Sequence, residues 1–140
     1  MDFDEFTGTA QHRLELAGTG EAVRAIRATL LPLGERLPEG HAADLAASLP
    51  MEIKWYMTGG VHEHGQRFDW PESLTRVADI EGADRADAAY HARVVVDLVR
   101  EVVPESDFRQ LRDELPESGG TEGWGNLFEV ADAGGWHAHE

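Results

Sequence analysis

The sequence predicts an all-α fold, built from tandem duplicated helical units packed as one compact helical bundle with pseudo-two-fold symmetry. Three observations lead to this prediction. Apolar residues recur every three or four positions along most of the chain, which is the period of an amphipathic helix. Residues 37–50 (LPEGHAADLAASLP) and 103–116 (VPESDFRQLRDELP) repeat one pattern of Pro, Glu and Leu. A polar, Gly-rich stretch, residues 58–67, separates the two copies.

The two copies align at one constant offset over a long stretch. When residues 21–50 are set against 87–116, eight of the 30 positions are identical, whereas average composition gives about two. The identical residues of the first copy are Ala22, Arg27, Glu35, Pro38, Glu39, Leu45, Leu49 and Pro50. We therefore expect a first helical unit at 1–57, a linker at 58–67, a second unit at 68–130 and a polar His-containing tail at 131–140.

Four helices are expected in the first unit. The first covers residues 2–16, and the second runs from a cap at Thr19 or Gly20 to about Arg36. Pro32 should kink this second helix or end its first half, and the Leu-Pro pair at 37–38 should stop it. Residues 40–48 form a short third helix, and Pro50 starts a fourth that reaches Met57.

The second unit should repeat this order. Asp69 and Asp84 are expected to cap two helices, the second of which continues to Val103. Although residues 94–96 are three valines, the residues on both sides keep a helical period, so we predict helix rather than strand. A last short helix is expected at 124–130, anchored by aromatic and aliphatic residues.

The charge of the chain is strongly negative. It contains 27 acidic and 12 basic residues, which give a net charge of −15, and Lys54 is its one lysine. Such a surface repels phosphate backbones and anionic lipids, so we expect no nucleic-acid and no membrane partner. The composition is typical of cytoplasmic proteins of halophilic archaea, although an acidic protein from a high-GC organism is an alternative. The absence of cysteine excludes disulfide and thiol chemistry.

A Gly-Gly-x-His-x-His pattern occurs twice, at residues 59–64 and 134–139. In extended backbone, residues i and i+2 point the same way, so each pair could chelate a metal ion. His62, His64, His137 and His139 are therefore candidate ligands for zinc or nickel. The alternative is that the pattern reflects only duplication and the polar character of a linker and a tail.

Three segments resemble the family catalogued as domain of unknown function 2267. They are DFDEF at residues 2–6, LGERLPEGHAADLAASLP at 33–50 and HARVVVDLVREVVPESDFRQLRDELP at 91–116. The resemblance covers about nine-tenths of the chain and implies an all-helical fold of tandem units. It implies no activity and assigns no catalytic residue.

The leading functional hypothesis is a non-enzymatic protein-interaction or regulatory module with an unknown protein partner. The chain shows no Gly-x-Ser-x-Gly motif and no phosphate-binding loop. A metal-binding protein is the alternative, and an enzyme with a groove between the two units is the third hypothesis. The aromatic residues near the unit ends could either fill the core between short helices or form an exposed partner surface; they are Trp55, Tyr56, Trp70, Trp124, Phe128 and Trp136.

Overall fold

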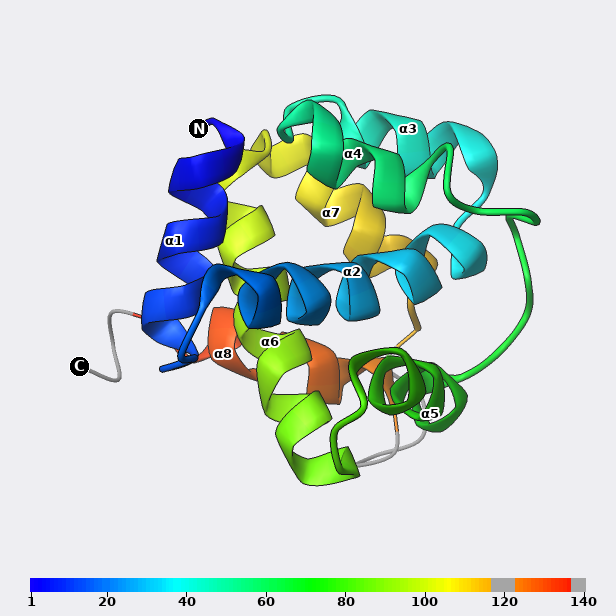
Figure 1. Cartoon of the computed structure of the whole chain (residues 1–140). Helices are drawn as coiled ribbons and strands as arrows, with labels where there is room; N and C mark the ends of the chain where they lie inside the picture. Colours follow the sequence, from blue (N-terminus) through cyan, green and yellow to red (C-terminus); the bar gives the residue numbers. More distant parts are fainter. Residues whose placement is uncertain (117–122, 137–140) are drawn as a thin grey trace.

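The described part of the chain is entirely helical. A computed structural model describes residues 1–116 and 123–136, and these residues contain no β-strand, which confirms the all-α prediction (Figure 1). The elements are α1 (Phe3–Arg13), α2 (Thr19–Arg36), α3 (Glu39–Ala46), α4 (Met51–Met57), α5 (Trp70–Glu81), α6 (Arg85–Val102), α7 (Glu105–Glu114), the 3-10 helix η2 (Trp124–Phe128) and α8 (Glu129–Asp132).

Helix α2 crosses the middle of the molecule and organises the core (Figure 1). It packs against α1, α4, α5 and α6. Its apolar face, which includes Ile26, Leu30 and Leu33, is buried in one hydrophobic cluster. That cluster also contains residues of α6, α7 and α8, so the two predicted units share a single core rather than folding as separate domains.

Pro32 does not end α2, which continues unbroken to Arg36. An interior proline removes one backbone hydrogen bond and costs about 3 kcal/mol. Leu30 and Leu33 flank it in the core, and burial of this face outweighs that cost. The helix stops where expected, because Leu37 is extended (φ −81°, ψ 147°) ahead of Pro38.

Aspartates cap the helices as the sequence predicts. Asp69 Oδ1 accepts a hydrogen bond from the Glu72 N–H (3.1 Å), and Asp84 Oδ1 accepts one from the Asp87 N–H (2.8 Å). Neither predicted cap of the second helix, Thr19 or Gly20, is correct, because α2 begins at Thr19 and Gly18 is its N-cap.

The helix bounds follow the predicted offset. Helices α2 and α6 are each 18 residues long and begin at Thr19 and Arg85, and α3 and α7 begin at Glu39 and Glu105. The predicted last helix is divided into η2 and α8. The pseudo-two-fold relation between the units remains a prediction.

The end of the described chain is anchored to α6 through a buried carboxylate. Asp97 is fully buried (0% exposed), and its Oδ2 accepts the backbone N–H of Trp136 at 2.9 Å, while Oδ1 accepts from Arg100 Nε at 2.9 Å. Arg13 of α1 stacks on the Trp136 ring, 5.1 Å from its centroid. Gly135 has φ +91°, a conformation that favours glycine, and this turn directs the Trp136 N–H toward Asp97.

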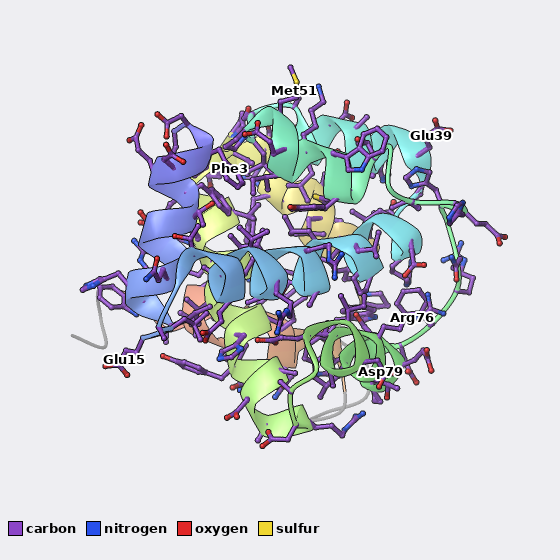
Figure 2. The ribbon with its side chains drawn as sticks, viewed as in Figure 1. Phe3, Glu15, Glu39, Met51, Arg76 and Asp79 are labelled. Carbon is purple, nitrogen blue, oxygen red and sulfur yellow. The ribbon has the colours of Figure 1, made fainter. Side chains whose placement is uncertain are left out.

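Charged and polar side chains cover the outside of the bundle, as Figure 2 shows for Glu39 and Asp79. Met51 projects from α4 and is 82% exposed. Within the ranges described, none of the helices has the length and apolar character that crossing a bilayer requires.

Candidate functional site: an arginine–aromatic hollow beside the linker

The predicted metal ligands are only partly described. His62 is exposed in the linker, and His64 is half-buried with its Nδ1 2.8 Å from the carbonyl oxygen of Gly34. His137 and His139 lie outside the described residues. Among the residues that the structure describes, no three His, Asp or Glu side chains come together in a metal-binding arrangement.

His64 also has a structural role at the end of α2. The last carbonyl groups of a helix have no partner within it, and Pro38 prevents its continuation. The linker supplies donors: the Gly65 N–H bonds to Leu37 O (2.9 Å), and His64 Nδ1 donates to Gly34 O. The linker is therefore held along the C-terminal end of α2.

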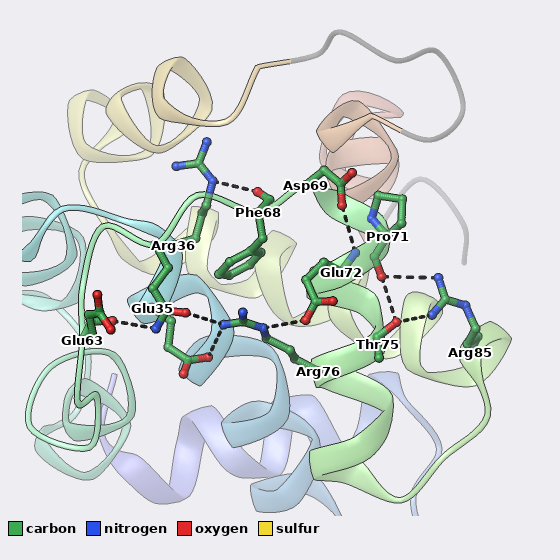
Figure 3. A network of polar contacts seen from close by, with 11 residues as sticks. Glu35, Arg36, Glu63, Phe68, Asp69, Pro71, Glu72, Thr75, Arg76 and Arg85 are labelled. Carbon is green, nitrogen blue, oxygen red and sulfur yellow. Dashed lines mark hydrogen bonds and ion pairs between the residues drawn. The ribbon is translucent and has the colours of Figure 1, made fainter.

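A second set of contacts joins the linker to α5 (Figure 3). Arg76 of α5 donates to Glu72 Oε2 (2.9 Å), to Glu35 Oε1 of α2 (3.2 Å) and to Gln66 Oε1 of the linker (3.0 Å). Its guanidinium also lies over the Phe68 ring, 3.9 Å from the centroid. Arg76 thereby fixes the position of Phe68 against α2 and α5.

These contacts form one side of an open hollow of about 450 Å³, which we call the arginine–aromatic hollow. It lies where the C-terminal end of α2, the end of the linker, the start of α5 and η2 meet (Figure 3). Its lining residues are Arg36, Arg67, Phe68, Asp69, Trp70, Glu72, Pro116, Gly123 and Trp124.

Three aromatic rings form a fixed apolar part of this hollow. The ring centroid of Trp124 is 5.8 Å from that of Trp70 and 6.4 Å from that of Phe68. Trp70 Nε1 donates to Asn126 Oδ1 at 3.1 Å, so its ring is also held by η2. Trp70 and Trp124 are both 3% exposed, as expected for residues that fill the core, and both line the hollow.

Arg36 provides a buried positive charge in the hollow. It is 6% exposed, and its Nε donates to the carbonyl oxygen of Phe68 at 3.0 Å. Burial, and then the nearby charge of Arg67, lower the pKa of Arg36, while the charge of Glu114 opposes them. An arginine with a lowered pKa is still protonated at neutral pH, so the hollow keeps this charge.

The carboxylates near Arg36 are engaged elsewhere. Glu114 Oε1 lies 2.9 Å from His41 Nδ1, and the contact of Glu114 with Arg36 is made by its backbone carbonyl at 3.5 Å. Asp69 caps α5, and Glu72 pairs with Arg76. Within the described residues, Arg36 therefore binds carbonyl oxygens and no carboxylate.

A comparison with protein-family models identifies the family of this chain. The model described as "Uncharacterized conserved protein (DUF2267)" matches residues 3–119. The chain belongs to the DUF2267 family. The matched range of the DUF2267 model includes Arg36, Arg67 and Trp70, and it ends before Trp124. A search of curated proteins finds no match.

Sequence reasoning did not single out Arg36 or Arg67 as site residues in this DUF2267 protein. It did note the aromatic residues at the unit ends, and the outcome differs between them, because Trp124 is buried whereas Trp55 is 59% exposed. The available signal was the sequence Arg-Phe-Asp-Trp at 67–70, in which one basic and two aromatic residues surround a helix cap. The other half of the hollow comes from residues more than 30 positions away along the chain, a relation that local spacing does not reveal.

Proposed function

We propose that this DUF2267 protein is a non-enzymatic interaction module, and that the arginine–aromatic hollow is its recognition site. One observation carries the proposal: a buried guanidinium, which among residues 1–116 and 123–136 hydrogen-bonds only to carbonyl oxygens, lines the same hollow as a second, exposed guanidinium and three aromatic rings. Arginine and aromatic residues are enriched where proteins recognise partners. The two carboxylates of the lining are held by a helix cap and an ion pair, which favours binding over acid–base chemistry.

The test compares captured partners between matched variants. Arg67→Gln removes an exposed charge of the hollow, and Arg24→Gln makes the same change at an exposed position of α2, 12 residues before Arg36 and about 18 Å along the helix axis. We expect a partner that is captured from the source cells by the wild type and by Arg24→Gln, and is lost with Arg67→Gln. Equal capture by both variants would show that the hollow is not the recognition site.

The composition supports a place of action in the cytoplasm of a halophile. Twenty-seven acidic residues against 12 basic ones produce self-repulsion that concentrated salt screens. Contact pairs between arginine and a partner's anion persist under such screening better than long-range attraction does, because the charges touch. Capture should therefore be carried out in about 1 M KCl, where the Debye length is about 3 Å.

Metal binding through His62, His64, His137 and His139 is the second candidate. The supporting observation is that His64 Nδ1 donates to Gly34 O, which leaves Nε2 as the nitrogen for a metal ion and fixes the ring orientation. Metal analysis of untagged protein should find zinc or nickel in the wild type and little in the His62→Ala/His137→Ala double variant. Absence of metal from the wild type, with no thermal shift on adding either ion, would exclude this candidate.

A further inference from the structure

The hydrogen-bonding capacity of Arg36 is not exhausted by its carbonyl partners. A guanidinium carries five N–H donors in a planar fork. Arg36 uses Nε on Phe68 O at 3.0 Å and Nη2 on Glu114 O at 3.5 Å, and among the described residues Nη1 has no acceptor. The donor groups that remain belong to a residue that is only 6% exposed and lines the hollow.

The two guanidinium groups of the hollow repel each other. The positive charge of Arg67 is one of the causes that lower the pKa of Arg36. Arg67 is exposed and makes no hydrogen bond or ion pair within residues 1–116 and 123–136. A bound anion would relieve this repulsion and form charge-assisted hydrogen bonds, which are the strong ones in proteins.

The aromatic rings determine what should accompany the anion. Phe68, Trp70 and Trp124 line the hollow beside the two arginines, and Arg36 lies over the Trp124 ring at 5.9 Å from its centroid. The two tryptophans are 3% exposed and Phe68 is half-buried, so Phe68 offers most of the accessible apolar surface. Because Asn126 and Arg76 hold Trp70 and Phe68 in place, little side-chain freedom remains to be lost on binding. A ring or alkyl group next to the anion would therefore gain by leaving water.

The surrounding negative charge and the cost of desolvation favour an anion with a single negative charge. The protein carries a net charge of −15, and Asp69 and Glu72 lie in the lining of the hollow itself. A phosphate dianion or a polyanion is repelled more strongly by these carboxylates, and its desolvation cost grows with the square of its charge, whereas its attraction to the two arginines grows only in proportion to the charge.

We infer that the arginine–aromatic hollow binds a monocarboxylate attached to an aromatic or apolar group, the chemistry presented by the last residue of a peptide chain. Arg67 and the donor groups of Arg36 that have no described acceptor hold the carboxylate, and the attached group packs mainly on Phe68, beside Trp124. This inference rests on the proposed function, because it assigns a ligand class to the same site. It does not require that the partner be known.

A pair of matched small ligands tests the carboxylate directly. N-acetyl-tryptophan and N-acetyl-tryptophanamide share the same ring and differ in the terminal charge. We titrate each ligand in about 0.5 M KCl and follow the NMR shifts of the protein's own tryptophan indole N–H groups. The dissociation constant of the acid should be about tenfold lower than that of the amide, which corresponds to about 1.4 kcal/mol. Inorganic phosphate, the third ligand, should bind more weakly than the acid.

The same variants identify the site. Arg67→Gln should weaken binding of the acid about tenfold and leave binding of the amide unchanged, since one charge-assisted contact is lost. Arg24→Gln should bind both ligands as the wild type does. We choose Arg67 rather than Arg36 because the exposed side chain has no described partner, so its loss leaves the fold intact.

The possible outcomes separate the two proposals. Equal affinity for acid and amide, or tighter binding of phosphate than of the acid, would overturn the monocarboxylate inference. If Arg67→Gln loses a captured partner while the acid does not bind, the hollow is a recognition site for another ligand class. If the acid binds through Arg67 but partner capture does not depend on it, the monocarboxylate inference is upheld and the proposed interaction role is wrong.

Discussion

Replacement of Asp97 by asparagine tests how the end of the described chain is held. Each carboxylate oxygen accepts one hydrogen bond at 2.9 Å, from Trp136 N and from Arg100 Nε, and Arg13 Nη1 lies 4.0 Å from Oδ2. Asparagine preserves the size of the side chain, but it removes the charge and turns one acceptor into an NH2 donor. One of the two donors must then face another donor inside the protein.

The expected loss of stability follows from these contacts. A hydrogen bond to a charged group contributes about 1.5–3 kcal/mol, and a buried donor left unsatisfied costs about 1–3 kcal/mol. Because Arg100 is 37% exposed, solvent screens its share, so we expect a total loss of about 3 kcal/mol. At about 4 °C per kcal/mol for a chain of this size, Tm should fall by about 12 °C.

The control for Asp97→Asn is Asp79→Asn, the same substitution at an exposed position of α5. Both variants reduce the negative charge of the molecule equally, so the difference between them isolates the buried contacts. Melting in about 1 M KCl measures stability, and hydrogen exchange at the Trp136 amide reports the local bond. If Asp97→Asn were as stable as Asp79→Asn, with Trp136 still protected, the carboxylate would not be the anchor.

Three further predictions concern pH, packing and salt. The hydrogen bond with Glu81 raises the pKa of His91 above 6.5, although burial opposes this rise. The pair therefore stabilises the fold fully below about pH 6.5, and this stabilisation is lost as the pH rises through the higher folded-state pKa. His91→Gln should remove the resulting decline in Tm. Gly34→Ala should lower stability by about 1–3 kcal/mol, because its Cβ would lie 2.6 Å from Met57 O, whereas Gly8→Ala, with nothing within 4 Å, should raise it by up to about 1 kcal/mol in denaturant titrations. Raising KCl from about 0.1 to 1 M should raise Tm by screening a net charge of −15, and a Tm that falls would contradict this interpretation.

Much of the fold could be predicted because its signals are local. Caps such as Asp69 and Asp84 act on an N–H three residues later, and apolar periodicity identifies each buried face from neighbouring positions. Pro32 shows where local rules fail. Its effect on an isolated helix is a break, but burial of the α2 face against four other helices decides the outcome, and no local pattern contains that energy.

The candidate site was harder to predict because its parts meet only through tertiary contacts. Arg93 illustrates this: its Nε donates to Asn126 O at 3.0 Å, 33 residues away, and lies 3.6 Å from Glu129 Oε2. Asn126 in turn accepts from Trp70, so one side chain of η2 positions residues of both α5 and α6. Spacing along the chain does not specify a meeting of this kind.

The hollow can be traced to the way α2 ends. Because Pro38 prevents further helix, the last carbonyls of α2 need donors, and the linker satisfies them through His64 and Gly65. This path of the linker leads to Phe68, whose carbonyl oxygen accepts from Arg36 and whose ring lies near Trp124. The two arginines and the rings are thus brought together by helix capping, and the contact that orients His64, a candidate metal ligand, also holds the linker that leads into the wall of the hollow. An experiment that removes His64 therefore affects both candidate functions, metal binding and recognition at the hollow. Arg67→Gln changes the hollow alone, so this variant distinguishes the two functions.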